Sequence, residues 1–436
     1  MTKVSTISDV YDWLNRMPAF QVHGAVAARL GLDRIQSFCD LMGNPERQIP
    51  CIHVAGTNGK GSVCAMLALA YEYAGFRCGL YMSPHLEHVR ERIRINREMI
   101  PEPDFLRFFQ LYASDISSSD LSYYEITTAA AFWWFNEAKA DIVVLETGLG
   151  GRLDATNIVK PEISVITSIA HDHQHFLGHT ITEIAGEKGG IIKEKRPVVL
   201  GNMPDAAEKK LLQIAGEHHS GVIKARTLQP RYRTSGPVNN SRSGFEIVNQ
   251  SQRKFMESDL KAPVHRWNVA AAWLTVSALQ PRFVVSEAQF SKAIANVGRS
   301  GLLPGRFEKL VPGLEWFFDG AHNPEAVRAL IKSIDRQDWN DEPVIVLCIM
   351  KDKAQKKMLE PFSVFKKNYY YALATERAAD ITQIAAYLSD VKELPAGEAE
   401  ILRFFKELTK QVVIFTGSFY FYSVVKRWIS QIIKAG

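Results

Sequence analysis

The sequence has 436 residues, of which 46% are hydrophobic and 23% are charged. A chain of this length and composition can bury a sizeable core, which excludes wholesale disorder and favours two or three domains over one. Its formal net charge of +5 is too small for a nucleic-acid coat or a polybasic membrane anchor. Since it shows no export signal and no apolar window of about 18 residues, we expect a cytoplasmic protein, most simply a monomer, with no nucleic-acid or membrane partner.

The cysteines are odd in number and widely spaced, and none belongs to a CxxC pair: Cys39, Cys51, Cys64, Cys78 and Cys348. This pattern argues against a disulfide framework and against a zinc knuckle. A reducing compartment is the simplest location for such a chain.

Short runs rich in Val and Ile alternate with helical patterns, which is typical of βαβ units around a parallel sheet. Helices are predicted at Ser62–Tyr73, with Gly75 as its cap, and at Tyr124–Lys139. In the first part of the chain, strands are predicted at Ile49–Ala55, Arg77–Met82, Asp141–Thr147, Glu162–Ile169 and Pro197–Leu200.

A polar stretch over residues 227–259, rich in Pro, Gly, Ser and Asn, interrupts this alternation and predicts loops or a small antiparallel excursion. A helix is predicted at His265–Leu279, and Gly298–Arg306 has the Gly and Pro content of a domain linker. A second series of strands follows, at Glu315–Asp319, Val344–Ile349, Tyr369–Ala374 and Val412–Thr416.

The strongest local motif is HVAGTNGKGS, from His53 to Ser62, which lies between a predicted strand and a predicted helix. In this setting glycines let backbone amides approach phosphate oxygens, and Lys60 can reach the terminal phosphates. The motif departs from GxxxxGK[ST], because Val54 replaces the first Gly and the hydroxyl moves to Ser62. The alternative is a Gly-rich turn with a surface lysine.

The predicted fold is therefore α/β. A large P-loop-type ATP-binding domain with a mainly parallel sheet is expected over residues 1–298. A linker at 299–306 and a smaller Rossmann-like domain at 307–436 follow.

The GTNGKGS loop and the segments after it resemble the Mur-type amide ligases, especially the bacterial bifunctional folylpolyglutamate synthases/dihydrofolate synthases. The resemblance extends from about Phe20 almost to the C-terminus. It implies an ATP-dependent ligase that adds L-glutamate to dihydropteroate and to folates through an acyl phosphate. Seven segments follow in the order of the family: SPHL (83–86), ERIRIN (91–96), ETGLGGRLDATN (146–157), EKGGIIK (187–193), PGRFE (304–308), DGAHNPE (319–325) and GSFYF (417–421).

Glu146 ends the apolar run DIVVLE, where a carboxylate at the carboxyl edge of a sheet can face a nucleotide. Hard cations take oxygen ligands, so Glu146 suits phosphate-bound Mg²⁺. Ser83 can supply a second oxygen, although alone it is more typical of a turn before Pro84. The resemblance implies two Mg²⁺ ions, one held by Ser83 and Glu146 and the other by His173.

The run HDHQH places His171, His173 and His175 in alternation, which leaves a zinc site open as an alternative. Lys188 has the composition of an exposed helix lysine. The resemblance instead implies that Lys188 is carbamylated near the second metal, with Gly189 in place of the usual Ala.

Arg92 and Arg94 alternate with Ile93 and Ile95, which also fits a half-buried strand with a solvated face. The resemblance implies that dihydropteroate binds at Ser122, Tyr123, Tyr124, Glu125, Leu153, Asp154 and Ala155. For Asp154, capping of the turn that follows is the alternative.

Lys60, His173 and Lys188 are the expected catalytic residues. From the motifs and the resemblance, ATP is expected between the two domains, bound by Thr57, Asn58, Gly59, Lys60, Gly61, Ser62, Asn268, Arg306, Asp319 and His322. Two alternatives stay open: a nucleotide-dependent switch or binding protein, and a Mur-type ligase for cell-wall precursors. The chain has no NKxD signature, and SPHL and RLDATN favour the folate enzymes.

Overall fold

The computed structural model describes residues 4–17, 30–235, 242–249, 252–337, 339 and 341–434. The chain divides into two compact units. Unit 1 consists of Met1–Leu260 and Val264–Leu303, and unit 2 of Lys261–Pro263 and Pro304–Gly436.

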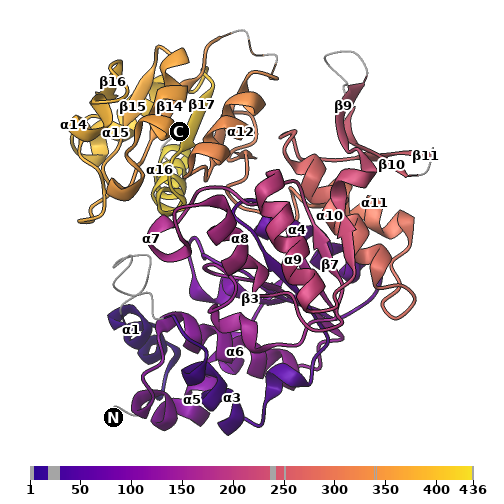
Figure 1. The fold of residues 1–436 in the computed structure, drawn as a ribbon. Coiled ribbons are helices and arrows are strands. Elements are labelled where there is room, and N and C mark those ends of the chain that lie inside the picture. The colour runs from indigo at the N-terminus through magenta and orange to yellow at the C-terminus, as the bar shows by residue number, and fades with distance from the viewer. Residues whose placement is uncertain are drawn as a thin grey trace. The chain divides into compact units, whose positions relative to one another are not determined.

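An eight-stranded sheet with the order β4-β3-β2-β5-β1-β6-β7-β8 forms the centre of unit 1 (Figure 1). The strands from β2 to β8 along this order are parallel, and β3 and β4 are antiparallel additions at one edge. The strands are β1 (Cys51–Ala55), β2 (Cys78–Tyr81), β3 (Ile93–Ile95), β4 (Glu98–Met99), β5 (Ile142–Glu146), β6 (Ile163–Ile166), β7 (Val198–Leu200) and β8 (Val222–Lys224).

Helices cover both faces of this sheet, because successive side chains of a strand point to opposite faces. Val144 packs with α4, α10 and α11, whereas its neighbours Val143 and Leu145 pack with α5 and α6. The helices are α1 (Ile7–Arg16), α3 (Asp33–Leu41), α4 (Lys60–Tyr73), α5 (Glu102–Ser118), α6 (Tyr123–Glu137), α7 (Gln174–Leu177), α8 (Ile181–Gly189), α9 (Asp205–Glu217), α10 (His265–Ala278) and α11 (Glu287–Asn296). Short 3-10 helices are η2 (Pro45–Arg47), η3 (Val89–Arg92), η4 (Ala155–Ile158) and η5 (Ala225–Leu228).

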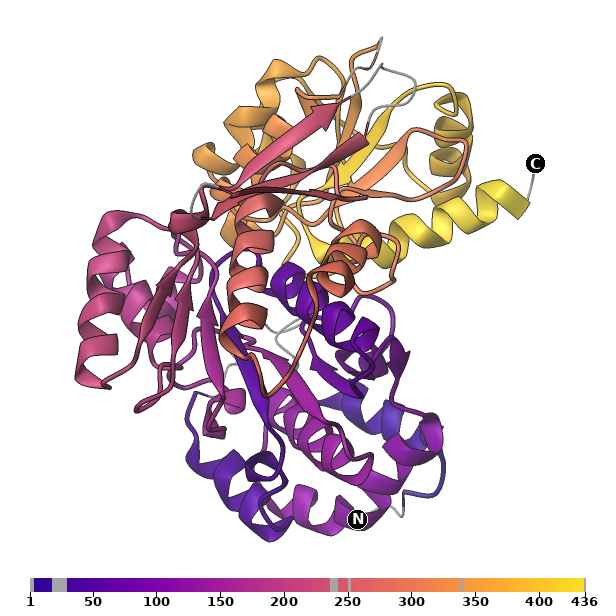
Figure 2. The ribbon, with the colours of Figure 1, turned by 90° about the vertical axis from the view of Figure 1, so that its right-hand side faces the viewer.

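The polar stretch after η5 forms an antiparallel sheet of β9 (Arg231–Ser235), β10 (Arg242–Asn249) and β11 (Gln252–Glu257) (Figure 2). The predicted antiparallel excursion is therefore correct. Phe245 and Ile247 of β10 are buried in the same cluster as α10 and α11, so this small sheet is part of the core of unit 1.

Unit 2 contains a six-stranded sheet with the order β12-β13-β17-β14-β15-β16, parallel except for the edge strand β12. Its strands are β12 (Glu308–Lys309), β13 (Trp316–Asp319), β14 (Val344–Leu347), β15 (Asn368–Tyr370), β16 (Val391–Glu393) and β17 (Val413–Thr416). Its helices are α12 (Pro324–Ile334), α13 (Lys356–Leu359), α14 (Ile381–Ala385), α15 (Glu398–Glu407) and α16 (Tyr422–Lys434), with 3-10 helices η7 (Lys351–Lys353), η8 (Glu360–Val364) and η9 (Phe419–Phe421). The predicted α/β fold, with a large and a smaller mainly parallel sheet, is confirmed.

The structure corrects the starts of two predicted helices: α6 begins at Tyr123 rather than at Tyr124, and the change at α4 affects the loop. Helix α4 begins at Lys60 rather than at Ser62, because Gly59 has a φ of 89° and ends the loop at that point. Lys60 is therefore the first helical residue, directly after a conformation that favours glycine.

All five cysteines are free and buried. Burial raises the pKa of each thiol, in the case of Cys51 to about 12. Separately, no helix in the described ranges combines the length and the apolarity that crossing a membrane requires.

Candidate active site

The loop between β1 and α4 is held in place by the segment that follows β6. Thr57 N–H donates to Ser168 O at 2.8 Å, and Ala170 N–H donates to the Thr57 hydroxyl at 3.0 Å. The Asn58 carbonyl accepts the Thr167 hydroxyl at 2.7 Å and the Ser168 hydroxyl at 3.0 Å. This support was not predicted, since its signal in the sequence is only a run of small polar residues after a strand.

Two glycines of the loop make close approaches that a larger residue would prevent. A Cβ on Gly56 would lie 1.9 Å from the Thr167 hydroxyl oxygen, and a Cβ on Gly59 would lie 2.4 Å from Asn268 Oδ1. The structure therefore brings Asn268, on α10, against the loop, as expected for two parts of one nucleotide site. Asn268 is 8% exposed, and its side chain lies 3.2 Å from His265 Nδ1.

Lys60 folds back over its own loop. Its ammonium donates to the carbonyls of Gly56 at 3.0 Å and Thr57 at 3.2 Å. Ser62 is buried in the first turn of α4. The lysine ammonium thus lies over the loop at the N-terminus of α4, and a cation beside a helix N-terminus is an arrangement that can bind an anion.

Glu146, at the end of β5, lies beside this loop. It is 3% exposed, and its Oε2 accepts Ser83 N–H at 3.0 Å. A Cβ on Gly61 would be 3.8 Å from both carboxylate oxygens, so Glu146 directly faces the start of α4. A buried carboxylate and a serine at a phosphate-binding loop are a fitting oxygen donor set for Mg²⁺ that also binds phosphate oxygens.

Lys188, on α8, is 4% exposed and was not predicted as buried from its composition. Burial lowers its pKa to about 7; the Lys60 ammonium adds to this effect, and the carboxylates of Asp172, Asp154 and Glu187 oppose it. A lysine close to neutrality thus lies within the electrostatic range of the loop lysine and of Asp172.

The HDHQH run forms the start of α7. His173 has a φ of 48°, and its N–H donates to the carboxylate of the buried Asp172 at 2.9 Å. His171 and His175 are exposed. Within the described ranges no three His, Cys, Asp or Glu side chains gather in a way that could hold a metal ion, so this run offers no ready-made zinc site.

The predicted substrate segment begins α6. Ser122 is its N-cap and forms a capping box with Glu125, whose carboxylate also pairs with Arg34 at 3.2 Å. Tyr123 and Tyr124 are buried or nearly so, and the Tyr124 hydroxyl donates to Asp154 at 3.3 Å.

Asp154 accepts five hydrogen bonds. Oδ2 accepts the N–H groups of Gly148 and Leu149, both at 2.8 Å. Oδ1 accepts the N–H and the hydroxyl of Thr156, at 3.1 and 2.5 Å, and the Tyr124 hydroxyl. Asp154 is thus the N-cap of η4, as the alternative interpretation held, and contact with a pterin stays a prediction. Of its neighbours, Leu153 is partly buried and Ala155 is buried.

Arg92 departs from the expected solvated face. It ends η3, is 5% exposed, and donates from Nε to His85 Nδ1 at 2.8 Å. Its guanidinium lies 5.6 Å from the centre of the Tyr123 ring. The strand β3 begins only at Ile93, so Arg92 does not take part in its alternation, and the half-buried strand fits only the residues after it.

Unit 2 has its own polar cluster. The Arg306 guanidinium lies 4.4 Å from the centre of the Phe419 ring, and the His322 ring lies 5.7 Å from it. Asp319 accepts two backbone N–H groups at 2.9 Å. Burial raises the pKa of Asp319 to about 6, against the opposing effect of Arg306. The structure thus brings the three predicted residues of this unit together.

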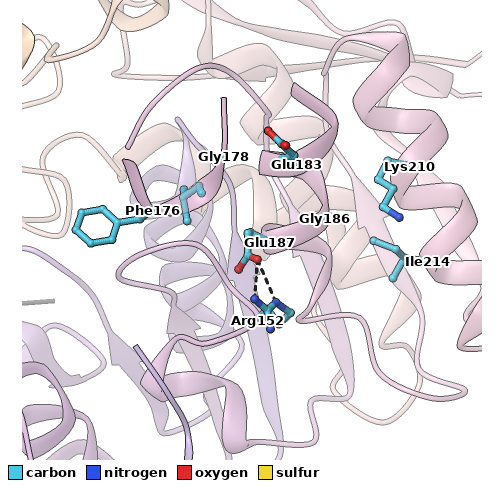
Figure 3. A pocket seen from close by; sticks show the side chains of 9 residues that line it. Arg152, Phe176, Gly178, Glu183, Gly186, Glu187, Lys210 and Ile214 are labelled. Atoms are coloured by element: carbon cyan, nitrogen blue, oxygen red, sulfur yellow. Dashed lines mark hydrogen bonds and ion pairs between the residues drawn. The ribbon is translucent and has the colours of Figure 1, made fainter. Parts of the chain in front are cut away.

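A surface hollow lies over α7, α8 and α9 (Figure 3), and Lys188 is not part of its lining. Figure 3 shows Arg152 and Glu187 joined by two hydrogen bonds, at 2.9 and 3.1 Å. Glu183 accepts the N–H groups of His179 and Thr180 at the start of α8. The two acidic side chains of the hollow are thus engaged, Glu187 with Arg152 and Glu183 with the backbone at the start of α8.

Comparison with known proteins identifies both parts of the chain. Residues 54–276 match the Mur ligase middle domain, and residues 305–419 match the Mur ligase, glutamate ligase domain. The chain is 31% identical over 438 residues to the dihydrofolate synthase/folylpolyglutamate synthase of Bacillus subtilis (strain 168), which covers 93% of this chain and 97% of that relative.

Two solved structures are similar over almost the whole chain. E. coli FolC in complex with DHPP and ADP superposes with a TM-score of 0.84 and 28% identity over 99% of each chain. A bifunctional folylpolyglutamate synthase/dihydrofolate synthase with Mn, AMPPNP and L-glutamate bound gives a TM-score of 0.81 and 27% identity over 98% of each chain.

The chain belongs to the Mur ligase family. Within that family, its relatives include bifunctional dihydrofolate synthases/folylpolyglutamate synthases, which confirms the resemblance seen in the motifs.

Proposed function

We propose that this chain is an ATP-dependent ligase that joins the amino group of L-glutamate to two kinds of carboxylate. With dihydropteroate the product is dihydrofolate, and with the γ-carboxylate of a folate it is a longer glutamate tail. The observation that carries the proposal is that a middle domain and a glutamate ligase domain occur in one chain in this order. A nucleotide-dependent switch would need only the first, and the relatives named above are folate enzymes rather than cell-wall ligases.

The reaction needs an activated carboxylate, because a carboxylate is a poor electrophile until one oxygen becomes part of a leaving group. A substrate carboxylate oxygen attacks the γ-phosphorus of ATP, the bond to the bridging oxygen breaks, and ADP leaves. The neutral amine of glutamate then attacks the acyl phosphate, phosphate leaves, and the nitrogen loses a proton. Lys60 and the amides at the start of α4 stabilise the charge on the transferred phosphoryl group.

Ser83 and Glu146 would hold one Mg²⁺ at the phosphates, and His173, beside Asp172, would hold the second. When bound, these ions neutralise charge on phosphate oxygens during transfer. Glu146 also accepts Ser83 N–H, which orients the carboxylate relative to the loop.

Replacing Glu146 by Gln should weaken the Mg²⁺ dependence and lower the rate together, by roughly tenfold or more, because a neutral amide oxygen replaces an anionic ligand. The measurement is a Mg²⁺ titration of ADP release. Glu162→Gln is the matched control, since Glu162 is also largely buried but pairs with Arg196 and Arg282. An unchanged Mg²⁺ titration in Glu146→Gln would place this carboxylate in the core instead.

Lys188 is proposed to be carbamylated. The neutral amine attacks the carbon of CO₂, a C–N bond forms, and one proton passes to solvent, which turns a cation into a carboxylate-like group. Its burial and its pKa of about 7 support this step, because the amine is partly neutral at physiological pH. The resulting negative charge would lie within the electrostatic range of Lys60.

Asp154→Ala should impair dihydropteroate ligation more than ATP binding, because a buried acceptor at the substrate segment is lost, at a cost of about 1–3 kcal/mol. For this variant the KM for dihydropteroate, the KM for ATP, the two ligation rates and the melting temperature are measured. Equal loss of both ligation activities with a lower melting temperature would assign Asp154 to capping alone.

The proposed activity is tested with purified protein, MgATP and L-glutamate, with dihydropteroate and tetrahydrofolate supplied separately. We expect ADP release and a mass gain of one glutamate residue with each acceptor. Activity with tetrahydrofolate alone would remove the dihydrofolate synthase part of the proposal, and ATP hydrolysis without a mass gain would refute the ligase.

A further inference from the structure

His53 is a fully buried histidine in the middle of the central strand β1. It is 0% exposed and lies in register with Leu145 of β5 and Ser164 of β6. Burial, with the Lys193 ammonium, lowers its pKa to about 3, so the ring is neutral. Among the described residues its Nδ1 has no hydrogen-bond partner. A buried polar atom without a partner costs folding free energy that an apolar side chain would not cost. The contribution of His53 must therefore come from its other ring nitrogen.

The other nitrogen, Nε2, lies 2.8 Å from the hydroxyl oxygen of Thr156. That hydroxyl donates its only proton to Asp154 Oδ1 at 2.5 Å. Asp154 is the acceptor in all five of its hydrogen bonds, including the one from the Thr156 hydroxyl, so the Thr156 oxygen is left to accept from His53. His53 is therefore the Nε2–H tautomer, and its N–H fixes the direction of the Thr156 hydroxyl.

Asp154 transmits this orientation to the predicted substrate segment. One of its oxygens holds the turn at Gly148 and Leu149, and the other holds the Tyr124 hydroxyl. A Cβ on Gly148 would lie 2.6 Å from the Tyr124 ring, so the turn and the ring are packed together. The direction of the Thr156 hydroxyl thus affects how Asp154 holds the turn at Gly148 and Leu149 and how it holds the Tyr124 hydroxyl.

We propose that His53 is a positioning residue for the dihydropteroate site, acting through Thr156 on Asp154 and Tyr124. The inference rests on the proposed function, because it assigns the Tyr124–Asp154 segment to dihydropteroate. His53 is fully buried, so its effect on the site passes through Thr156 and Asp154. Its effect is to restrict Asp154 to one orientation before the pterin binds, which lowers the ordering cost of binding.

The test compares variants that remove or keep the donor. His53→Leu removes the ring nitrogens, and Thr156→Val removes the hydroxyl between His53 and Asp154. His53→Gln keeps an N–H donor near the position of Nε2. The matched control is Ser164→Ala, which removes a different buried hydrogen bond of the adjacent strand, to Ile191 O at 2.7 Å. For each variant the KM for dihydropteroate, the KM for ATP, kcat and the melting temperature are measured.

We expect His53→Leu and Thr156→Val to raise the KM for dihydropteroate about tenfold with the KM for ATP within about twofold of wild type, the effect of one lost buried hydrogen bond. His53→Gln and Ser164→Ala should keep the wild-type KM for dihydropteroate. Imidazole ¹⁵N shifts of the wild type should show a protonated Nε2 and a bare Nδ1.

An unchanged KM for dihydropteroate in His53→Leu, or equal rises of both KM values with a fall in melting temperature, would overturn the inference. A wild type that ligates tetrahydrofolate but not dihydropteroate would overturn the bifunctional proposal instead. In that case the KM for tetrahydrofolate is measured for the same variants. An unchanged KM for tetrahydrofolate in His53→Leu would then overturn the positioning role as well.

Discussion

Lys60→Ala should lose about 10²–10³-fold in ligation rate while the chain stays folded. The lysine is partly exposed, and its hydrogen bonds reach only the carbonyls of its own loop, so its removal costs little folding energy. The loss in rate follows because a charge that faces the transferred phosphoryl group is removed from a preorganised site.

The measurement is ADP release at saturating MgATP, with the melting temperature recorded for the same sample. Lys210→Ala is the matched control, since Lys210 lies in the surface hollow outside the loop. Near-wild-type ligation by folded Lys60→Ala would refute the phosphate-binding role of the loop.

Lys188→Ala should lower activity by a similar or larger factor, and a short carboxylic acid such as formate or acetate should partly restore it. The reason is that the proposed carbamate supplies a negative charge that alanine lacks and that a small carboxylate can replace. Lys60→Ala is the control for this rescue, because the loop needs a cation and should not respond to added carboxylate. An unmodified Lys188, shown by mass or density in an active, ligand-bound sample, would refute the modification.

The lowered pKa of Lys188 should also make the stability of the protein depend on pH. Its folded pKa of about 7 lies below the ordinary lysine pKa of 10.5, so between these two pH values the unfolded lysine binds a proton that the folded one lacks. In CO₂-free buffer, the free energy of unfolding should rise with pH between these two pKa values. Below about pH 7 the folded lysine is charged as well, so the full free-energy cost of burying its charge is present there. Lys188→Met should therefore stabilise the unmodified protein most at pH 6. A stability difference that does not change between pH 6 and 9 would contradict the lowered pKa.

Much of the sheet of unit 1 could be predicted because its strands are buried on both faces. The predicted strand Asp141–Thr147 contains β5, Ile142–Glu146, which is a continuous apolar run before its final carboxylate. The short strands β8, β12 and β16 were not predicted. They lie at sheet edges, and β16, Val391–Glu393, is partly buried at one residue and exposed at two, so it has no apolar run.

The loop and Glu146 were also predictable, because each is marked by residues that are consecutive in the sequence. The long-range contacts that support the residues of the site have no such signal. His53 and Thr156 are 103 residues apart, and Asn58 and Ser168 are 110 residues apart. No single-sequence pattern pairs such residues, so the buried positions of Arg92, Lys188 and His53 required the fold.

The five buried cysteines make the native chain a poor target for thiol reagents. A thiolate is the reactive form, and each native thiol is both covered and held protonated at neutral pH. A cysteine introduced at an exposed position of α9, by Lys209→Cys, would then be the one that maleimides label. Spectroscopic probes can therefore be attached at chosen surface positions without first replacing the native cysteines.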